Sequence, residues 1–135
     1  MYWKNPAQIA LVIIFISVVI YSCDDTLVQS DIDGRIIPDN QVSFSEHIQP
    51  VLNLKCAFSG CHDDQTRAAN LSITTWANVV SDPSIVFPYY PQNSRLAWAI
   101  EGTGSTLMPP YGYPALTQNQ IDGIKTWIAE GATNN

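Results

Sequence analysis

The sequence predicts a small, mostly α-helical domain. Two segments open with the spacing of a capping box, in which a Ser or Thr is followed three residues later by Glu or Gln: Ser43 with Glu46, and Thr117 with Gln120. Apolar residues recur at helical spacing after both sites, and no segment shows the alternation that is typical of a strand. A chain of 135 residues is the size of one small domain.

The N-terminus has the features of an export signal. An apolar run over residues 7–20 follows Lys4, and it is shorter than the roughly twenty apolar residues that a bilayer-spanning helix needs. A basic start, a short apolar core and a small residue before the cleavage site are typical of a signal peptide. We therefore expect residues 1–22 to direct the chain out of the cytoplasm.

The end of this leader resembles the lipobox of bacterial lipoproteins. Ile20 is an aliphatic residue three positions before Cys23, and Ser22 directly precedes the cysteine, whereas Tyr21 departs from the usual small residue. The resemblance implies that cleavage makes Cys23 the new N-terminus and that its sulfur carries lipid. An uncleaved anchor helix that ends near Cys23 is the alternative. Both arrangements place the domain in the cell envelope, on the periplasmic or outer-surface side and close to a membrane.

The segment that follows predicts a flexible tether. Residues 24–42 are polar and acidic with few aromatic side chains, a composition typical of segments that stay unfolded. A random coil of this length reaches on the order of 25 Å. We therefore expect a lipidated N-terminus and tether over residues 23–42 and a folded domain over residues 43–135.

The first helix of the domain is expected to begin at Ser43 and to run out into Lys55-Cys56. Pro50 interrupts it, because proline removes one backbone hydrogen bond and kinks a helix or confines its regular part. The apolar residues that follow helical spacing are Phe44, Ile48, Val51 and Leu52.

Short helices and proline-rich loops are expected in the middle of the chain. The sequence favours a short helix at about residues 75–80 and an ordered loop over residues 82–93, which holds three prolines. Ser94 can cap a further helix that Gly102 ends. A long irregular segment rich in Gly and Pro follows and contains Met108.

The last helix is the clearest element. It is expected to begin at Thr117 and to end at Gly131, which supplies a stop signal. Its apolar face is formed by Ile121, Ile124, Trp127 and Ile128.

The run Cys56-Ala57-Phe58-Ser59-Gly60-Cys61-His62 carries the main chemical signal. Two thiols can add across the two vinyl groups of a haem, and the histidine that follows the second cysteine then becomes an axial iron ligand. Four residues separate the cysteines here, whereas most such motifs have two, and Ser59-Gly60 gives the backbone the freedom to bulge outward. We therefore predict one covalent haem c on Cys56 and Cys61, with His62 on the iron.

The second axial ligand must come from elsewhere in the chain. Met108 is the only methionine after the leader, and it lies in Leu107-Met108-Pro109-Pro110, a stiff loop that can hold a thioether in place. Met108 is therefore the predicted sixth ligand. His47, on the first helix, is the competing ligand, and an open iron is the third possibility.

Other interpretations of the cysteines are weaker. A disulfide between Cys56 and Cys61 would close a very small loop and would leave His62 unexplained. Zinc could take these three residues with His47 or Asp63 as a fourth ligand, but adjacent Cys and His ligands are awkward for one tetrahedral centre. A cysteine protease has no second supporting feature.

The charge balance is acidic. Twelve Asp and Glu oppose six Lys and Arg, and loss of the leader with Lys4 leaves five basic residues. Such a surface opposes nucleic-acid binding, which requires basic patches. It is compatible with a basic or neutral protein partner, although solubility alone explains it equally well.

The chain resembles class I mono-haem c-type cytochromes, and within them the planctomycete-type cytochrome c domain. The resemblance covers residues 43–132. It is carried, beside the motif, by the pattern of Phe44 to Leu52, by Ser94-Arg95-Leu96, by Leu107-Met108-Pro109-Pro110 and by the run from Trp127 to Ala132. The longer cysteine spacer is the departure from the family pattern.

The resemblance implies a helical domain wrapped around one haem. It implies thioether links at Cys56 and Cys61, His62 as proximal ligand and Met108 as distal ligand, and first and last helices that cross beside the haem. The expected function is single-electron transfer between redox partner proteins, without enzymatic turnover of a substrate. A haem-based gas sensor and a structural cytochrome subunit of a larger membrane redox complex are the alternatives.

Overall fold

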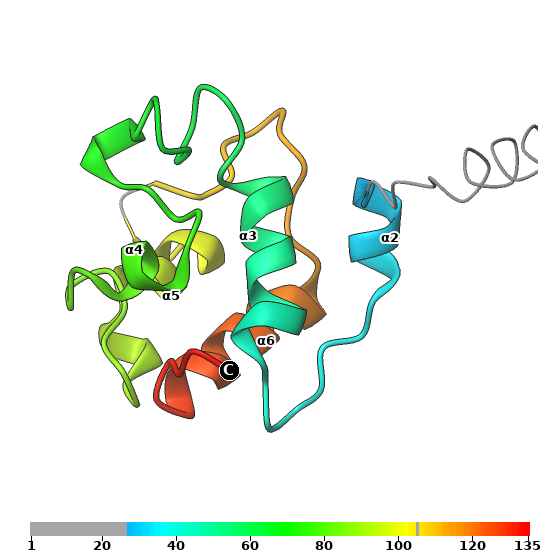
Figure 1. Ribbon diagram of the computed structural model, residues 1–135, viewed down its shortest axis with the longest axis vertical. Helices are drawn as coiled ribbons and strands as arrows, with labels where there is room; N and C mark the ends of the chain where they lie inside the picture. The colour runs from blue at the N-terminus through cyan, green and yellow to red at the C-terminus, as the bar shows by residue number, and fades with distance from the viewer. Residues whose placement is uncertain (1–26, 105) are drawn as a thin grey trace, which may run out of the picture.

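The computed structural model describes residues 27–104 and 106–135, and within these ranges it is mostly helical with no strand. This confirms the mostly α-helical class (Figure 1). The helical elements are α2 (Gln29–Gly34), η1 (Phe44–Ile48), α3 (Gln49–Lys55), η2 (Ala68–Asn70), α4 (Trp76–Val80), η3 (Pro91–Asn93), α5 (Arg95–Glu101) and α6 (Gln118–Ala129).

The first predicted helix divides into two parts at the position that Pro50 dictates. The Ser43 side chain accepts a hydrogen bond from the backbone N–H of Glu46, which confirms the N-terminal cap. η1 is a π-helical turn, and the regular α-helix α3 begins only at Gln49, with Pro50 in its first turn. Proline is tolerated there because the N–H groups of a first turn have no intrahelical partner.

The last helix forms as predicted and packs against the first. Thr117 accepts from the backbone N–H of Gln120, and the Gln120 side chain accepts from the N–H of Thr117, so both halves of the capping box are present. The rings of Phe44 in η1 and Trp127 in α6 lie 5.2 Å apart between centroids. Both rings are buried, so this contact joins the first and last helical segments of the domain in its core.

The short helices of the middle segment also form. Thr75 caps α4 through the N–H of Asn78, and Gly102 ends α5 in a left-handed conformation. The expected cap by Ser94 is wrong. Its hydroxyl instead accepts from the N–H of Phe87 at 2.8 Å and lies 3.1 Å from the carbonyl of Tyr90, so it organises the preceding proline-rich loop.

Residues 27–42, called the strap below, do not form a free tether. Ile32, Ile37 and Val42 are buried in the same core as α3 and α6, with at most 3% of their surface exposed. α2 lies beside α3 (Figure 1). The three apolar side chains lie five residues apart among polar ones, so average composition conceals them.

Side chains of α6 and of the residue that follows it fix the strap by polar contacts. The amide of Asn119 bonds both the N–H and the carbonyl of Ile37, at 2.8 and 2.9 Å. The carboxylate of Glu130 accepts from the N–H groups of Gln41 and Val42, at 2.6 and 2.9 Å. These hydrogen bonds fix the backbone of the strap, whereas the backbone of a flexible linker would be hydrogen-bonded to water.

The segments that are predicted to attach the protein to a membrane lie outside the described residues. The apolar run 7–20 and the expected lipidation site Cys23 precede Leu27, the first described residue. Among residues 27–104 and 106–135, no helix has the length and apolar character that a membrane span requires.

Candidate functional site

The Cys-His motif begins where α3 ends. Cys56 caps the helix, and its N–H still donates to the carbonyl of Leu52 at 2.9 Å. The chain then turns back on itself, because the N–H of His62 donates to the carbonyl of Cys56 at 3.1 Å. A second turn bond joins the N–H of Cys61 to the carbonyl of Phe58 at 3.0 Å. These bonds bring both cysteines and the histidine into one closed loop.

The extra residues of the cysteine spacer bulge outward, as expected. Gly60 has a φ of 91°, in the left-handed region that glycine adopts without strain, and it is exposed. Its N–H donates to the Asp63 carboxylate and to the Thr66 hydroxyl, both at 3.1 Å. The bulge is therefore an ordered turn.

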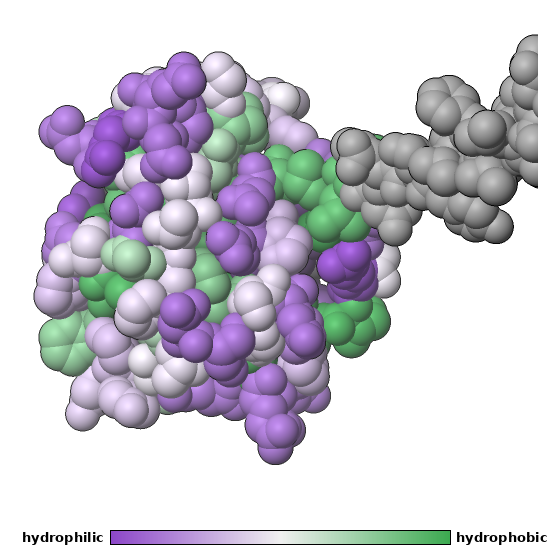
Figure 2. Space-filling view, viewed as in Figure 1, coloured by the Kyte–Doolittle hydropathy of each residue, from purple (hydrophilic) through white to green (hydrophobic). Residues whose placement is uncertain are grey.

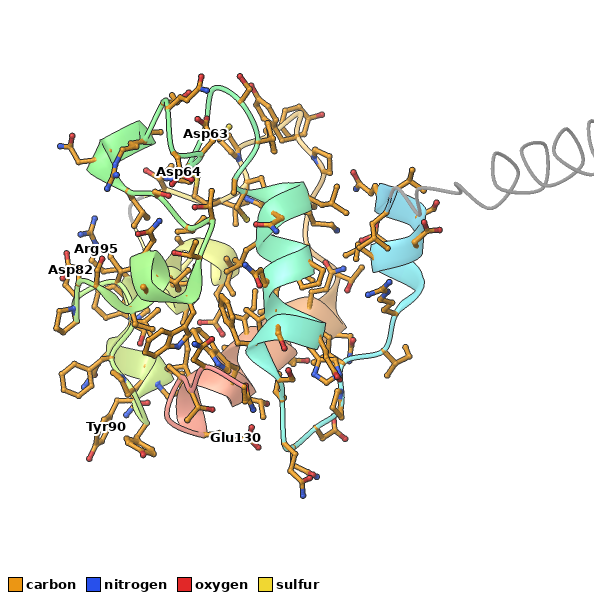
Figure 3. All side chains as sticks on the ribbon, viewed as in Figure 1. Asp63, Asp64, Asp82, Tyr90, Arg95 and Glu130 are labelled. Atoms are coloured by element: carbon orange, nitrogen blue, oxygen red, sulfur yellow. The ribbon has the colours of Figure 1, made fainter. Side chains whose placement is uncertain are left out.

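Asp63 organises this turn. Its carboxylate also accepts from the N–H groups of Gln65 and Thr66, at 2.7 and 2.8 Å. Hydrogen bonds to Thr66, followed by those to Gln65 and Gly60, lower the pKa of Asp63 to about 2. Figure 3 shows Asp63 and its neighbour Asp64 on this loop, on the side of α3 away from α2.

His62 has one ring nitrogen oriented by the backbone. Its Nδ1 lies 3.3 Å from the carbonyl of Leu71, and its own carbonyl accepts from the N–H of Ile73. A carbonyl only accepts, so this contact requires the proton on Nδ1. In the neutral imidazole, Nε2 then carries the lone pair, as in metal-bound histidines that are oriented by a carbonyl.

The two thiols are free and partly buried. Cys56 and Cys61 form no disulfide, and both are half-buried. Burial raises the pKa of the Cys56 thiol to about 12, and the nearby Lys55 offsets only part of this effect. A nucleophilic cysteine needs the opposite shift, so this burial does not favour Cys56 as a protease nucleophile.

The geometry does not favour zinc either. Among residues 27–104 and 106–135, no group of three or more His, Cys, Asp or Glu side chains converges on a point that could hold a metal ion.

The loop that carries Met108 contacts the motif at Phe58 and the end of α3 at Lys55. The Phe58 and Tyr113 rings stack with centroids 5.7 Å apart and an interplanar angle of 28°. The ammonium group of Lys55 donates to the carbonyl of Ala115 at 2.6 Å. Met108 itself is half-buried, and its N–H donates to the carbonyl of Ala99 in α5 at 2.8 Å. The structure thus places the Met108 loop beside the motif and anchors it on α5.

His47 lies at the other end of the first helix. Its Nδ1 accepts from the N–H of Ser43 at 2.9 Å, and its side chain lines a small cavity with Ile32 and Ile37 of the strap. The structure therefore groups His47 with the strap and not with Cys56.

Sequence reasoning missed the role of Lys55. The side chain is fully buried, and its ammonium group lies 2.5 Å from the Asp33 carboxylate of the strap. The signal was present, because Lys55 follows Val51 and Leu52 at helical spacing and so continues the apolar face.

The features that carry the site are thus local and specific: a closed Cys-His loop, an oriented imidazole, and a methionine loop packed beside them. Comparisons with protein-family models, with curated proteins and with solved structures found no significant match.

Proposed function

We propose that this protein is a mono-haem c-type cytochrome that is tethered to a membrane and carries single electrons outside the cytoplasm. The observation that carries the proposal is the closed motif loop, in which His62 is tied to Cys56 by its N–H and oriented by the Leu71 carbonyl. This arrangement presents two thiols and one basic nitrogen from a single turn of chain. It matches the donor set that covalent haem attachment requires.

Four residues would hold the haem, each in a different role. Cys56 and Cys61 would form the thioether links, and His62 would supply a nitrogen ligand to the iron through Nε2. Met108 would supply a second iron ligand, since its loop contacts the motif at Phe58 through Tyr113 and the preceding Lys55 through Ala115. A bound haem would supply one-electron chemistry, the iron passing between its ferrous and ferric states. The protein's contribution is to keep both ligands in place and to exclude water.

The envelope location and the partners belong to the same proposal. Lipid on Cys23 would hold the protein at a membrane of the cell envelope, where redox partner proteins donate and accept electrons. An acidic surface suits basic or neutral partners, because complementary charge raises the rate of encounter. The protein would make or break no substrate bond, so it is not an enzyme.

Optical spectroscopy of variants tests this proposal. The full chain is produced in a host that exports it and attaches c-type haem, and reduced and oxidised spectra are recorded. We expect the sharp reduced bands of a six-coordinate low-spin iron. Cys56→Ala with Cys61→Ala should yield colourless protein, and Met108→Ala should lose the low-spin spectrum but keep the haem.

His47→Ala is the matched control for the sixth ligand, and its spectrum should equal that of the parent. Loss of the low-spin spectrum in the His47 variant instead of the Met108 variant would assign the sixth ligand to His47. Rapid, tight binding of carbon monoxide to the reduced parent would contradict the electron carrier and favour a gas sensor. Colourless parent protein would contradict haem binding altogether.

A further inference from the structure

The ordered strap leaves very little chain between the membrane and the domain. Leu27 is the first residue of the strap, so only residues 24–26 separate it from Cys23. The four Cα–Cα steps from Cys23 to Leu27 span at most about 14 Å even when fully extended. Attachment at Cys23 therefore keeps Leu27 within that distance of the lipid headgroups, whether the anchor is lipid on the cysteine or the apolar run before it.

Exposed apolar side chains border this attachment point. Leu27 and Val28 just before α2 expose 38% and 50% of their surface, and Ile36 just after α2 exposes 78%. Figure 2 shows hydrophobic surface next to the point where the described chain begins. Ile32 on α2 is buried in the core beside α3. The apolar residues that flank the two ends of α2 are exposed to solvent.

We propose that this surface, formed by Leu27, Val28 and Ile36, rests on the bilayer that holds Cys23. The inference deepens the proposed function, because it depends on membrane attachment at Cys23. Short reach fixes which side of the domain can meet the lipid, and burial of exposed apolar side chains in the interface favours that contact.

Charge specifies the kind of lipid surface. Arg35 and Asp31 are both exposed within the same stretch, and after Cys23 the chain holds five basic against twelve acidic residues. An acidic domain is repelled by anionic lipid, so the contact depends on the anchor and on apolar burial. The surface therefore suits a zwitterionic interface, and the contact should persist at high salt.

The orientation directs the candidate haem site away from the membrane. α2 lies on one side of α3, whereas the motif loop with Asp63, η2 and α4 lie on the other (Figures 1 and 3). With α2 against the bilayer, the motif loop faces the aqueous phase. Its electron partners would then be water-soluble proteins or domains that project from the membrane.

Site-directed spin labelling tests this orientation. The lipid-attached full chain is reconstituted into phosphatidylcholine vesicles, and flotation verifies attachment. Ile36→Cys is labelled with a nitroxide, and Tyr111→Cys, in the Met108 loop, is the matched control because Tyr111 is also highly exposed. The unsubstituted protein, labelled in parallel, supplies the background from any unreacted native thiol.

We expect the label at position 36 to collide with oxygen at least three times more often, relative to a water-soluble nickel chelate, than the label at position 111. High salt should leave this ratio unchanged. Equal ratios at the two positions, or a lipid signal at position 111, would overturn the orientation. Protection of position 36 in a soluble form that lacks residues 1–23 would assign the surface to contact between copies and would also overturn the orientation.

The same samples separate the two proposals. Their visible spectra report haem attachment independently of the collision ratios, so colourless protein with a lipid-facing position 36 would refute the cytochrome and support the orientation. Protein that does not float with vesicles would refute the membrane anchor and the orientation together.

Discussion

The ammonium group of Lys55 and the carboxylate of Asp33 lie 2.5 Å apart, and the lysine side chain has no exposed surface. Lys55 directly precedes Cys56, and it also donates to the carbonyl of Ala115. One buried cation therefore joins three segments: the strap, the helix that leads into the motif, and the end of the Met108 loop. Asp33 is its only carboxylate partner among residues 27–104 and 106–135.

Asp33→Asn should destabilise the protein markedly. The substitution keeps the shape but leaves the Lys55 charge buried with a carbonyl as its main partner. Breaking a buried pair in this way costs about 3–5 kcal/mol, and partial exposure of Asp33 reduces the expected loss to about 2 kcal/mol of unfolding free energy. Urea denaturation measures it, and a loss below about 0.5 kcal/mol would contradict the role of the pair.

Lys55→Met should cost less than Asp33→Asn. Methionine fills the apolar path of the lysine side chain, and Asp33 keeps hydrogen bonds from Gln120 and Gln29 and some contact with water. The double variant should be more stable than the sum of the two losses predicts, because the variants remove the same interaction. Strict additivity in a double-mutant cycle would show that the two residues act independently.

Stability should fall in acid through Asp33. The pair with Lys55 lowers the pKa of Asp33 below its usual value of about 4, with smaller contributions from Gln120 and Gln29. A lowered folded-state pKa adds stability that is present above the unfolded pKa and is lost as pH falls through the folded pKa. The unfolding free energy should therefore decline below about pH 4, and Asp33→Asn should flatten that decline. An equally steep decline in this variant would assign acid sensitivity to other carboxylates.

Gly123→Ala should loosen the strap. A Cβ at Gly123 in α6 would lie 2.5 Å from Cγ2 and 3.0 Å from Cβ of the buried Ile37, so Ile37 or the helix must shift. Overpacking typically costs about 1–3 kcal/mol, which exceeds the gain of about 1 kcal/mol from replacing glycine within a helix. We therefore expect lower stability and faster proteolysis within residues 27–42.

Gly34→Ala is the matched control for that experiment. Nothing lies within 4 Å of a Cβ at Gly34, which ends α2 on the same strap. The control should match or slightly exceed the parent in thermal stability. Equal behaviour of the two alanine variants would show that close packing of Ile37 on α6 does not hold the strap.

Haem-free protein should fold poorly. A domain of this size buries limited apolar surface, and a bound haem would add to its core. Circular dichroism of the variant that carries both Cys56→Ala and Cys61→Ala measures the remaining helix content. Helicity and thermal stability equal to those of the parent would show that the polypeptide alone completes the core.

Local signals predicted much of the fold. The capping boxes at Ser43 and Thr117 mark helix starts because both partners lie within three residues of each other. The strap escaped prediction because its partners lie far along the chain: Glu130 bonds residues 88 and 89 positions away, and Asn119 bonds one 82 positions away. The burial of isolated apolar residues in an acidic segment can be predicted only when the surface that they pack against is known.

The candidate site was visible in the sequence to the same extent. Cys56, Cys61 and His62 are neighbours in the chain, so their spacing alone indicates a shared chemistry. The orientation of His62 Nδ1 depends on the carbonyl of Leu71, nine residues later, and no sequence motif predicts this contact. The partner of Lys55 depends on the strap, so its burial follows only from the assembled structure.

The mass of the intact mature protein tests the central claim most directly. Covalent attachment predicts that a chain beginning at Cys23 carries the added mass of one haem, which remains bound under denaturing conditions, together with the mass of its acyl chains. Peptide mapping should place the haem on the segment that contains Cys56 and Cys61. A polypeptide mass with no porphyrin added would contradict the cytochrome account.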